Sequence, residues 1–458
     1  MLPTISTWKG TSVKGDLMGR VNEPPRLPEG NFAAWSRDRL ALARRGADEC
    51  GDVWQLEPGV YVAATAGPCE EVLHRAQDFP KPPSPLFPPL KRAGGGAPTS
   101  EERAHARAAR MRGLRPQAVA ARIGEIASGT VRIADQWPTG RDVEILPLVR
   151  PVLAEVGVRY LFSEDAPSLL PFAWQLFVAR EVLVRPTRWV WPGWVPTPAR
   201  RFRTRQQVAF TDALRPIVRR RRSSGRLGDD VLGQMLRPSC RYGALAEGAI
   251  LDTLPGITVA TFETPSRAAG WILLHLARHP EAADRIAAEA ALLPADAAAT
   301  TSTHLERLQY TRALVSEVFR LHPPSWLLTR RAPQRTQLGD YTIDAGSTVL
   351  VCPYTAHRDA REHPEPDRFR PERWLDDSCS PAKPGVFLAF GTGPHSCEGA
   401  ALAMAMLTVL TAHTAHRYHL SEPPGPEPGY RVTTFEGLAT PGLHLRASVR
   451  GRAPSCLR

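Results

Sequence analysis

The 458-residue sequence lacks a long run of apolar residues near its start. A secretory signal needs an apolar core of about 7–15 residues, and a membrane-spanning helix needs about 20. Residues 1–20 offer neither, because they carry Lys14, Asp16 and Arg20 among polar neighbours. We therefore expect a protein without a membrane anchor, located in the cytoplasm.

Cysteine is scarce and unclustered. The chain has seven cysteines, an odd number, and no two of them form a Cys-x-x-Cys pair. Zinc sites need Cys and His ligands at characteristic short spacing, and disulfide scaffolds need dense, paired cysteines. The sequence argues against both and favours a reduced, intracellular protein. The seven are Cys50, Cys69, Cys240, Cys352, Cys379, Cys397 and Cys456.

The chain also lacks a Gly/Ser-rich or charged linker and any internal repeat. Length alone is a weak guide to domain number, and the 43% of hydrophobic residues suffices for a large core. We predict a single domain over residues 1–458. The 45 prolines cluster at 80–98, 185–198 and 423–428, which indicates long ordered loops there.

The pattern of apolar residues predicts a mainly helical protein with small β-sheets. Strands at 53–56 and 60–64 flank Pro58-Gly59 and should form a hairpin. Further strands are expected near 327–331 and 348–352, with a β-like segment towards the C-terminus. Helices are expected over 32–48, from 68, over 101–135, 244–290, 305–322 and 399–416.

Acidic residues are outnumbered by basic ones, which gives a formal net charge of +12. The densest run is Arg219–Arg222. It could bind nucleic acid, but no aromatic residues interleave with it as in a nucleic-acid platform. We favour a solvated, cation-rich helix end before Ser223-Ser224-Gly225, and no nucleic-acid partner. A basic surface would also steer an acidic redox partner.

The segment Phe390-Gly391-Thr392-Gly393-Pro394-His395-Ser396-Cys397-Glu398-Gly399 carries the strongest chemical signal. Its glycines let the backbone turn tightly and approach a large flat ligand. Cys397 precedes a predicted helix, whose free N–H groups and dipole favour a thiolate. Such a thiolate is a good axial ligand for haem iron. A lone cysteine in an apolar stretch is more often a buried small hydrophobic residue.

The spacing Phe-Gly-x-Gly-x-His-x-Cys-x-Gly resembles the haem-binding loop of the cytochrome P450 superfamily. The resemblance implies that Cys397 is the metal ligand of a haem b, with Phe390, Gly391 and His395 beside it, and that O2 is a co-substrate. It also implies the triangular P450 fold, with haem buried between a long central helix and the helix after the Cys loop.

Glu317 and Arg320 stand three residues apart in the predicted helix 305–322 and share one face. Such pairs are usually weak surface ion pairs, but the neighbours here are apolar, and a buried pair needs more hydrogen-bond partners. Arg373, in Pro371-Glu372-Arg373-Trp374, offers one. This order of motifs before the Cys loop also resembles the P450 superfamily, where the triad holds the haem-side core.

The segment Ala260-Thr261-Phe262-Glu263-Thr264-Pro265 lies in a predicted long helix and resembles the P450 oxygen-activation segment. Ile257, Ala260 and Thr264 fall on one helix face. As catalytic residues, Thr264 could donate a hydrogen bond to bound oxygen and Glu263 could relay protons. The plainer alternative for Thr264 is a hydrogen bond to the carbonyl of residue 260.

Two positions depart from the family pattern, with Thr261 where Gly is usual and Pro265 where Thr is frequent. Thr261 is expected to narrow the groove that Gly would leave open. Pro265 cannot donate to the Thr261 carbonyl and pushes it away, so the helix should be kinked or opened beside Thr264. Both departures bear on oxygen binding and on whether oxygen is inserted at all.

Haem carries two propionates, so cations should converge on it. The candidates are His395, then Arg331 with Arg330 as a register-shifted alternative, and the pair His105 and Arg110 with Arg107 as an alternative. Ala109 stands where a second arginine is expected. His357 is also family-like but more typical of a structural loop residue.

The expected pocket walls are apolar: Phe87, Leu90, Ala260, Leu327 and the Trp-rich loop 189–194, which could equally be a packed corner. Apolar walls predict a lipophilic substrate such as a terpenoid, a polyketide or an aromatic peptide. Fold class does not specify the substrate further.

The resemblance spans essentially the whole chain and implies a soluble, monomeric haem-thiolate monooxygenase of bacterial type. It would hydroxylate a secondary metabolite with O2 and electrons from a ferredoxin and its reductase. One alternative keeps the haem but catalyses desaturation, oxidative coupling or rearrangement. Another is a haem-binding sensor or carrier without turnover.

Overall fold

The computed structural model describes residues 23–28, 34–35, 37–82, 99–184, 195, 197–240, 243–376, 385–424, 431–432 and 437–451. It is 59% helical and 12% strand, which confirms the expected mainly helical class with small sheets. The chain divides into two compact units. The sheet unit takes its described residues from 1–83, 316–397 and 430–439, and the helical unit from 84–315, 398–429 and 440–458.

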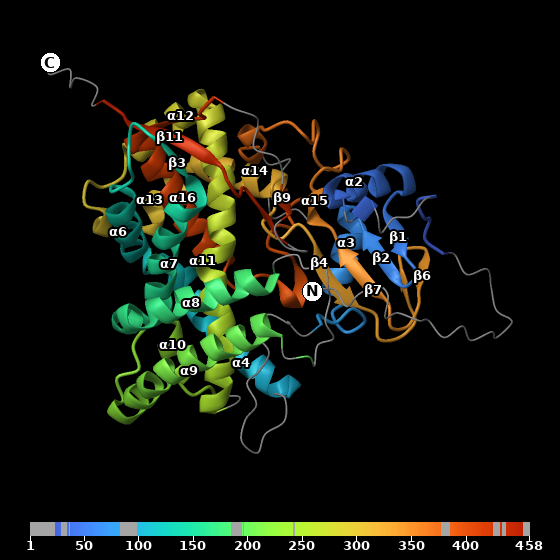
Figure 1. The fold of residues 1–458 in the computed structure, drawn as a ribbon, viewed down its shortest axis with the longest axis horizontal. Helices are drawn as coiled ribbons and strands as arrows, with labels where there is room; N and C mark the ends of the chain where they lie inside the picture. Colours follow the sequence, from blue (N-terminus) through green and yellow to red (C-terminus); the bar gives the residue numbers. More distant parts are fainter. Residues whose placement is uncertain are drawn as a thin grey trace. The chain divides into compact units, whose positions relative to one another are not determined.

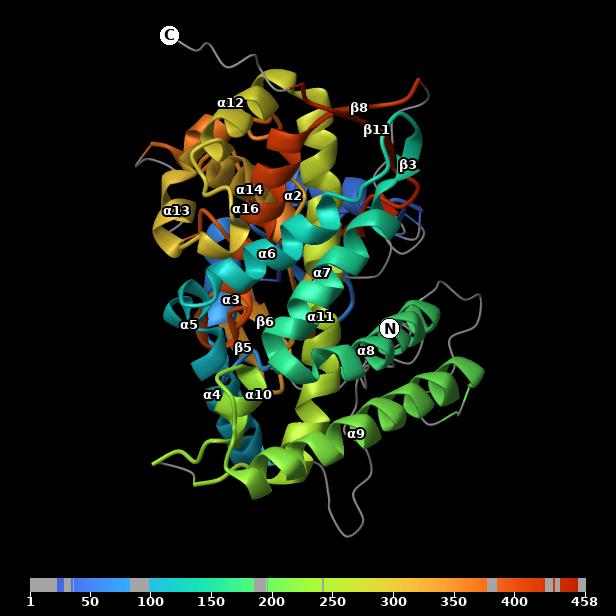
Figure 2. The ribbon, with the colours of Figure 1, turned by 90° about the vertical axis from the view of Figure 1, so that its left-hand side faces the viewer.

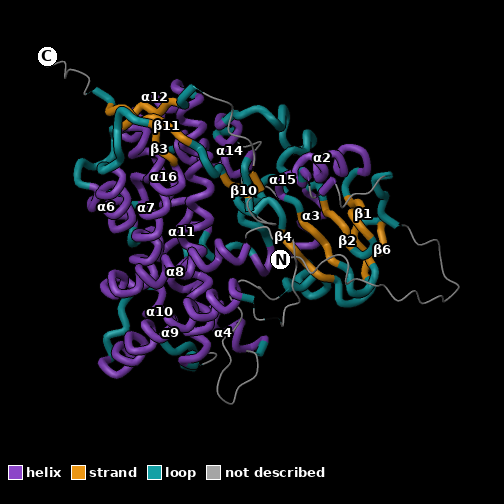
Figure 3. Tube along the Cα trace, in the orientation of Figure 1, coloured by secondary structure: helices purple, strands orange, loops and turns teal. Residues whose placement is uncertain are grey.

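A four-stranded sheet in the order β1-β2-β7-β4 forms the centre of the sheet unit (Figures 1 and 3). β1 (Val53–Glu57) and β2 (Val60–Ala63) form the predicted antiparallel hairpin, which Gly59 turns with a φ of 73°. β7 (Thr348–Val351) runs parallel to β2, and β4 (Leu328–Arg331) runs antiparallel to β7. The strands predicted near 327–331 and 348–352 are thus confirmed.

Short elements complete the sheet unit. Asp38 caps the first of them by accepting a hydrogen bond from the Ala41 N–H at 3.0 Å. The elements are α2 (Arg39–Cys50), α3 (Ala66–His74), the hairpin of β5 (Thr336–Leu338) and β6 (Tyr341–Ile343), α15 (Pro353–Ala356), the 3-10 turns η4 (Pro371–Trp374) and η6 (Gly393–His395), and the pair β9 (Arg431–Val432) and β10 (Leu438–Ala439).

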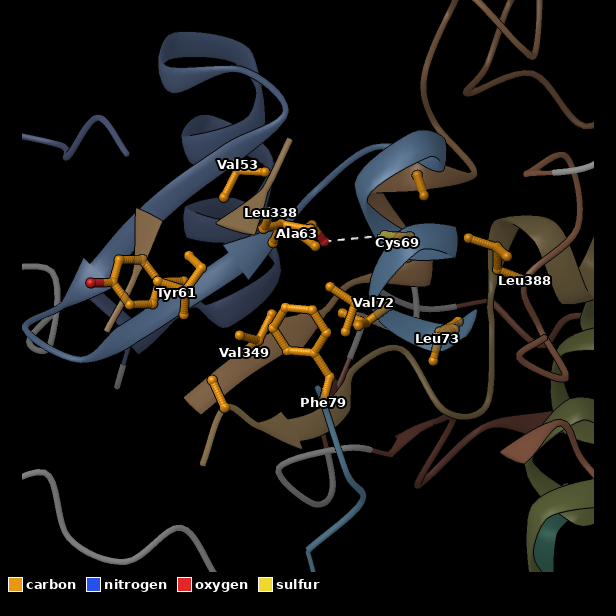
Figure 4. Close-up of a cluster of buried hydrophobic side chains, with 14 residues drawn as sticks. Val53, Tyr61, Ala63, Cys69, Val72, Leu73, Phe79, Leu338, Val349 and Leu388 are labelled. Atoms are coloured by element: carbon orange, nitrogen blue, oxygen red, sulfur yellow. Dashed lines mark hydrogen bonds between the residues drawn. The ribbon is translucent and has the colours of Figure 1, made fainter. Parts of the chain in front are cut away.

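A buried apolar cluster built from β1, β2, β7 and α3 fills the sheet unit (Figure 4). Within it lie Phe79, Val349 and Cys69, whose thiol donates to the Ala63 carbonyl at 3.2 Å. Burial raises the pKa of Cys69, because a low-dielectric environment disfavours the thiolate. Burial raises the pKa of Cys352 in the same way. Both cysteines therefore act as small core side chains.

The helical unit is arranged around α11 (Glu247–Arg278), along which α7 (Ile145–Phe162) packs (Figure 2). The other helices are α4 (Ser100–Leu114), α5 (Pro116–Ala120), α6 (Ile123–Ala134), η2 (Ser163–Asp165), α8 (Ala166–Val184), α9 (Pro198–Ser224), α10 (Val231–Leu236), α12 (Pro280–Ala290), η3 (Ala297–Ala299), α13 (Ser302–Arg307) and α16 (Ala400–Arg417), with α14 (Gln309–Leu321) shared between the units. Within the described segments, no helix has the length and hydropathy of a membrane span.

Prolines explain two of the interruptions in the predicted helices. The stretch 101–135 is three helices, and the first break falls where Arg115 takes an extended ψ of 150° before Pro116. The stretch 244–290 is two, since Pro280 starts α12 just after α11 ends. α11 itself continues through Pro265, so the opened turn, one of the two expected outcomes, is absent there, and the kink stays a prediction. Pro265 itself is buried, and the packing of α11 outweighs one lost hydrogen bond.

A second sheet, ordered β3-β11-β8, belongs to the helical unit. β11 (His444–Val449) is its central strand. It pairs antiparallel with β3 (Asp142–Glu144) on one side and with β8 (Tyr418–Ser421) on the other. This confirms the β-like segment predicted towards the C-terminus. The short β3 has only three residues, so the sequence pattern alone did not reveal it.

The basic run Arg219–Arg222 lies at the end of α9, as predicted, and Gly225 terminates the helix with a φ of 71°. The prediction of a solvated run is wrong for Arg221, which is 4% exposed. Its Nε lies 2.9 Å from Asp165 Oδ2 and its Nη1 lies 2.8 Å from Asp230 Oδ1. Buried carboxylates require cationic partners, and Arg221 is one.

Candidate active site

The loop before Cys397 folds back on itself. The Cys397 N–H donates to the Phe390 carbonyl at 2.8 Å. Gly391 and Gly393 have φ values of 64° and 69°, in the left-handed region that favours glycine. A Cβ at Gly393 would lie only 2.6 Å from the carbonyl oxygen of Leu73 in α3. The backbone of α3 therefore requires glycine at this position of the loop.

Cys397 is exposed, whereas Cys69 and Cys352 are completely buried. It stands three residues before Ala400, where α16 begins. An accessible thiol near a helix N-terminus has the setting of a reactive thiolate rather than of a core side chain. The exposed Cys240 lies outside such a glycine loop, so Cys397 is the described cysteine whose surroundings fit iron ligation.

Aromatic rings fasten the Cys loop within the sheet unit. The Phe390 ring centroid lies 4.9 Å from that of Phe319 in α14 and 6.0 Å from that of Phe387. Aromatic pairs at such separations contribute about 0.5–1.5 kcal/mol beyond the area that they bury. The loop therefore rests on α14, the helix that also carries Glu317 and Arg320.

His357 ties the same loop to α14 by hydrogen bonds. Its Nε2 accepts from the Leu388 N–H at 2.7 Å, and its Nδ1 lies 3.1 Å from the Arg320 carbonyl. Because Nε2 accepts, the ring proton sits on Nδ1 and donates to that carbonyl. Burial, followed by the nearby charge of His363, holds the pKa of His357 well below its usual value. His357 is thus a neutral, structural residue.

The structure brings Glu317, Arg320 and Arg373 together in the sheet unit, with side-chain exposures of 0%, 0% and 1%. Arg320 Nε and Nη2 lie 2.9 and 2.8 Å from the two Glu317 oxygens, and Arg373 Nε lies 3.1 Å from Oε1. Trp374 Nε1 donates to Oε2 at 2.8 Å. Burial alone would raise the pKa of Glu317, but the Arg320 hydrogen bonds and both guanidinium charges lower it.

One face of α11 is accessible in the helical unit. Ala260 is exposed and Ile257 and Thr264 are half-buried, whereas Phe262 is completely buried. The three predicted residues therefore share the accessible face. The Thr264 hydroxyl donates to Glu263 Oε2 at 3.5 Å rather than to the carbonyl of Ala260.

Glu263 itself is buried in a cluster of charges. Arg180 of α8 donates from Nη1 to Glu263 Oε1 at 2.9 Å, and Arg267, one turn further along α11, also pairs with Oε1. Glu181 accepts from the same Arg180 nitrogen at 3.0 Å. Burial lowers the pKa of Arg267, because the charged form loses hydration. Two guanidiniums thus neutralise the carboxylate that contacts Thr264.

Thr261 is directed at α7. Its hydroxyl donates to the Thr258 carbonyl at 2.7 Å, and a Cβ built on Gly157 of α7 would lie 2.6 Å from the Thr261 Oγ1. Gly157 therefore makes room for the side chain that replaces the usual glycine of α11. This differs from our expectation that Thr261 narrows the groove, because the facing helix receives its side chain.

We predict that Gly157→Ala destabilises the protein by about 1–3 kcal/mol, because the new methyl group overpacks the crossing of α7 and α11. Gly157→Ala combined with Thr261→Gly should recover most of the loss in thermal unfolding. The matched control is Gly67→Ala in α3, where nothing lies within 4 Å of the added methyl. A double variant no more stable than Gly157→Ala would contradict this account.

The candidate propionate ligands have different settings. Arg331 and His395 are exposed, whereas Arg330 is 4% exposed and His105 is 8% exposed. Exposure favours Arg331 over Arg330 for contact with a ligand. Arg110 is occupied by an ion pair with Glu398.

The expected pocket residues are only partly described. Leu327 is completely buried in the sheet unit, so it lines no accessible surface there. Ala260 of the helical unit is exposed. Phe87, Leu90 and the loop 189–194 lie outside the described residues.

Sequence reasoning missed three charged residues of the site. Arg267 stands four residues after Glu263, a spacing that could have revealed the pair. Arg180 is 83 residues away from Glu263 in the chain, and no local signal links them. From the sequence, Glu398 was considered only as part of the Cys motif. The structure shows that its carboxylate pairs with Arg107 and Arg110 of α4.

Comparison with known proteins decides the family. The cytochrome P450 family model matches residues 157–445, which is more than half of the chain. This chain belongs to the cytochrome P450 family. Cyclooctat-9-en-7-ol 5-monooxygenase of Streptomyces melanosporofaciens is 31% identical over 316 residues, which cover 67% of this chain and 68% of that relative. Pentalenene oxygenase of Streptomyces avermitilis is 28% identical over 232 residues, which cover 50% and 51%.

Solved structures agree on the fold of this cytochrome P450. The haem domain of cytochrome P450DA superposes with a TM-score of 0.80 at 18% identity, covering 94% of this chain and 98% of that one. The retinoic-acid-bound cyanobacterial CYP120A1 superposes with a TM-score of 0.76 at 19% identity, covering 94% and 100%. The predicted P450 fold is confirmed.

A cytochrome P450 is a monooxygenase that uses O2 and a haem with a cysteine thiolate ligand. The residues present fit that group. In the sheet unit, an accessible thiol follows a glycine loop that keeps side chains away from the backbone. In the helical unit, Ile257, Ala260 and Thr264 offer an accessible stripe of small and apolar groups.

Proposed function

We propose that this cytochrome P450 hydroxylates a lipophilic small molecule, a terpenoid or similar secondary metabolite. The observation that carries the proposal is the accessible stripe of Ile257, Ala260 and Thr264. Its apolar side chains could contact a lipophilic substrate, and its Thr264 hydroxyl contacts the carboxylate of Glu263. The two Streptomyces relatives support the substrate class, because their names describe oxygenation of cyclooctat-9-en-7-ol and pentalenene.

Electrons would come from a ferredoxin and its reductase, and the enzyme would act as a cytoplasmic monomer. The formal net charge of +12 supports an acidic redox partner, since opposite charge raises the rate of encounter. Association with such a partner should therefore weaken as salt is added, because salt screens exposed charges.

The cofactor would be held by residues from several elements. Cys397 would supply the axial thiolate, while Phe390 and Gly391 shape the loop around it. When bound, the haem supplies O2 activation, which thiolate electron density favours. In the sheet unit, the cations that would meet its propionates are His395 and Arg331. Arg110 of the helical unit is instead paired with Glu398.

Glu263 and Thr264 would handle protons at the accessible stripe. The Thr264 hydroxyl points its hydrogen at Glu263 Oε2, so the carboxylate orients this alcohol. Arg180 and Arg267 hold the carboxylate in place by charge-assisted hydrogen bonds. Once Glu263 has accepted a proton, this hydrogen bond would reverse: the Thr264 hydroxyl would rotate, accept the proton from Glu263 and give up its own on the accessible side.

The product mass tests the reaction. Hydroxylation consumes O2, two electrons and two protons, adds one oxygen atom to the substrate and releases the other as water. Incubation of the purified enzyme with a ferredoxin, its reductase and a cyclic terpene alcohol should give a product heavier by one oxygen atom, which derives from labelled O2. A product lighter by two hydrogen atoms would instead establish desaturation or coupling.

Glu263→Gln is predicted to lower kcat by about 10²–10⁴-fold, because it removes the acid that exchanges protons with Thr264. Turnover should be measured at a temperature at which the variant remains folded. The reason is that the change leaves Arg180 and Arg267 without their shared carboxylate, which costs stability as well.

The matched control for this change is Glu181→Gln. Glu181 pairs with the same Arg180 nitrogen but is 33% exposed and belongs to α8. We expect its kcat to stay within about twofold of the starting protein, since exposed ion pairs contribute little. Equal losses in the two variants would assign the effect to Arg180 rather than to proton transfer.

A further inference from the structure

Glu398, the residue directly after Cys397, is held by two arginines of α4. Arg110 binds the Glu398 carboxylate in a bidentate manner, with its Nε 2.9 Å from Oε2 and its Nη2 2.9 Å from Oε1. Arg107 Nη1 lies 2.5 Å from Oε1. The side chains of Glu398 and Arg110 are 15% and 13% exposed, and that of Arg107 is 31% exposed. Both oxygens of the Glu398 carboxylate therefore accept hydrogen bonds from arginine.

The local sequence explains this contact. Arg107 and Arg110 stand three residues apart on α4 and therefore share a face. The start of that helix is fixed by a capping box between Thr99 and Glu102. The planar guanidinium of Arg110 can donate two parallel hydrogen bonds to the carboxylate, a geometry that the single ammonium group of lysine does not offer.

The contact is not explained by capping of α16. A carboxylate just before a helix is favoured by the free N–H groups of its first turn. The N-cap of α16 is Gly399, however, and no side chain caps the helix there. Glu398 is instead turned towards α4, so its role concerns the segment that it shares with Cys397.

The brace formed by Glu398, Arg107 and Arg110 carries two positive charges and one negative charge, hence a net single positive charge. We propose that this brace positions Cys397 and sets, by its charge, the electron density that the thiolate passes to the haem iron. The proposal rests on Cys397 as the haem ligand. In this proposal Arg110 acts through Glu398, because its Nε and Nη2 both donate to that carboxylate.

The reduction potential of the haem iron tests the brace in the full-length, haem-loaded enzyme. Glu398→Gln removes negative charge and should favour the reduced iron, so the potential should rise. Arg110→Gln removes positive charge and should lower it. Each shift should change the ratio of reduced to oxidised iron threefold to tenfold at fixed potential, and tenfold corresponds to about 59 mV for one electron.

Opposite shifts separate charge tuning from structural damage, because a loosened loop would move both variants in the same direction. Glu398→Asp keeps the charge and should stay near the starting potential. Glu101→Gln, an exposed acid on the same helix, should leave the potential unchanged. If Arg110→Gln fails to take up haem, Arg107→Gln replaces it and should give a smaller downward shift.

Shifts of the same sign in Glu398→Gln and the arginine variant, or no shift in either, would overturn the proposal. The unmodified enzyme is examined first under carbon monoxide in the reduced state. A spectrum without the red-shifted thiolate band would overturn the assignment of Cys397, and the brace with it. A normal band with unaltered potentials would overturn the brace alone.

Discussion

Replacing Cys397 by serine is expected to abolish the strongly red-shifted absorption band of the reduced, carbon-monoxide-treated protein, and product formation with it. The alcohol of serine is a far weaker anionic ligand than a thiolate, so the electron density that favours O–O cleavage is lost. The measurement is the difference spectrum, followed by turnover with a ferredoxin and reductase.

Cys240→Ser is the matched control, since Cys240 is also exposed but stands outside the glycine loop. It should retain the band and the turnover in full. A Cys397→Ser protein that keeps the red-shifted band would show that another residue ligates the iron. A band typical of histidine-ligated haem in the unmodified protein would favour a sensor or carrier.

Replacing Glu317 by glutamine is expected to cost about 3–5 kcal/mol of unfolding free energy, because it leaves the buried charges of Arg320 and Arg373 without their carboxylate. Both guanidiniums and the Trp374 indole converge on the two Glu317 oxygens. The measurement is denaturant unfolding of the haem-loaded protein, with haem release followed in parallel.

Glu49→Gln is the matched control. Glu49 accepts a hydrogen bond from Arg45 at 2.7 Å, but their side chains are 48% and 52% exposed. The loss there should be about 0.5 kcal/mol or less, because water solvates either partner. A similarly small loss for Glu317→Gln would mean that other groups satisfy the two arginines.

The same triad predicts how stability responds to acid. The pKa of Glu317 is lower in the folded protein than in the unfolded chain, so its contribution is fully present above the unfolded value of about 4.3. The contribution is lost as the pH falls through the folded value. The stability of Glu317→Gln should therefore depend less on pH below about 4 than that of the parent.

Local motifs of the chain were sufficient for much of this site. The glycines around Cys397, the Glu317–Arg320 spacing and the stripe of Ile257, Ala260 and Thr264 each follow from short-range geometry. Such features could be read from the sequence because φ angles and helix periodicity depend on neighbouring residues. The interruption of helices at prolines has the same local origin.

Contacts between distant segments could not be read in that way. Arg180 reaches Glu263 only because α8 and α11 pack within the helical unit. Gly157 of α7 leaves space for the Thr261 side chain because α7 packs against α11, although the two residues lie about a hundred positions apart in the chain. The sequence-based expectation for Thr261 failed because it considered α11 without the helix that faces it.

The sequence by itself determined the family, the helical class and the cysteine that would bind the cofactor, because these depend on residue types at fixed short spacing. Tertiary structure alone decided which charges meet. Glu263 pairs with Arg180, and Glu398 pairs with Arg110, at sequence separations of 83 and 288 residues. Long-range ion pairs depend on how elements pack, and packing is a property of the whole core rather than of any one segment.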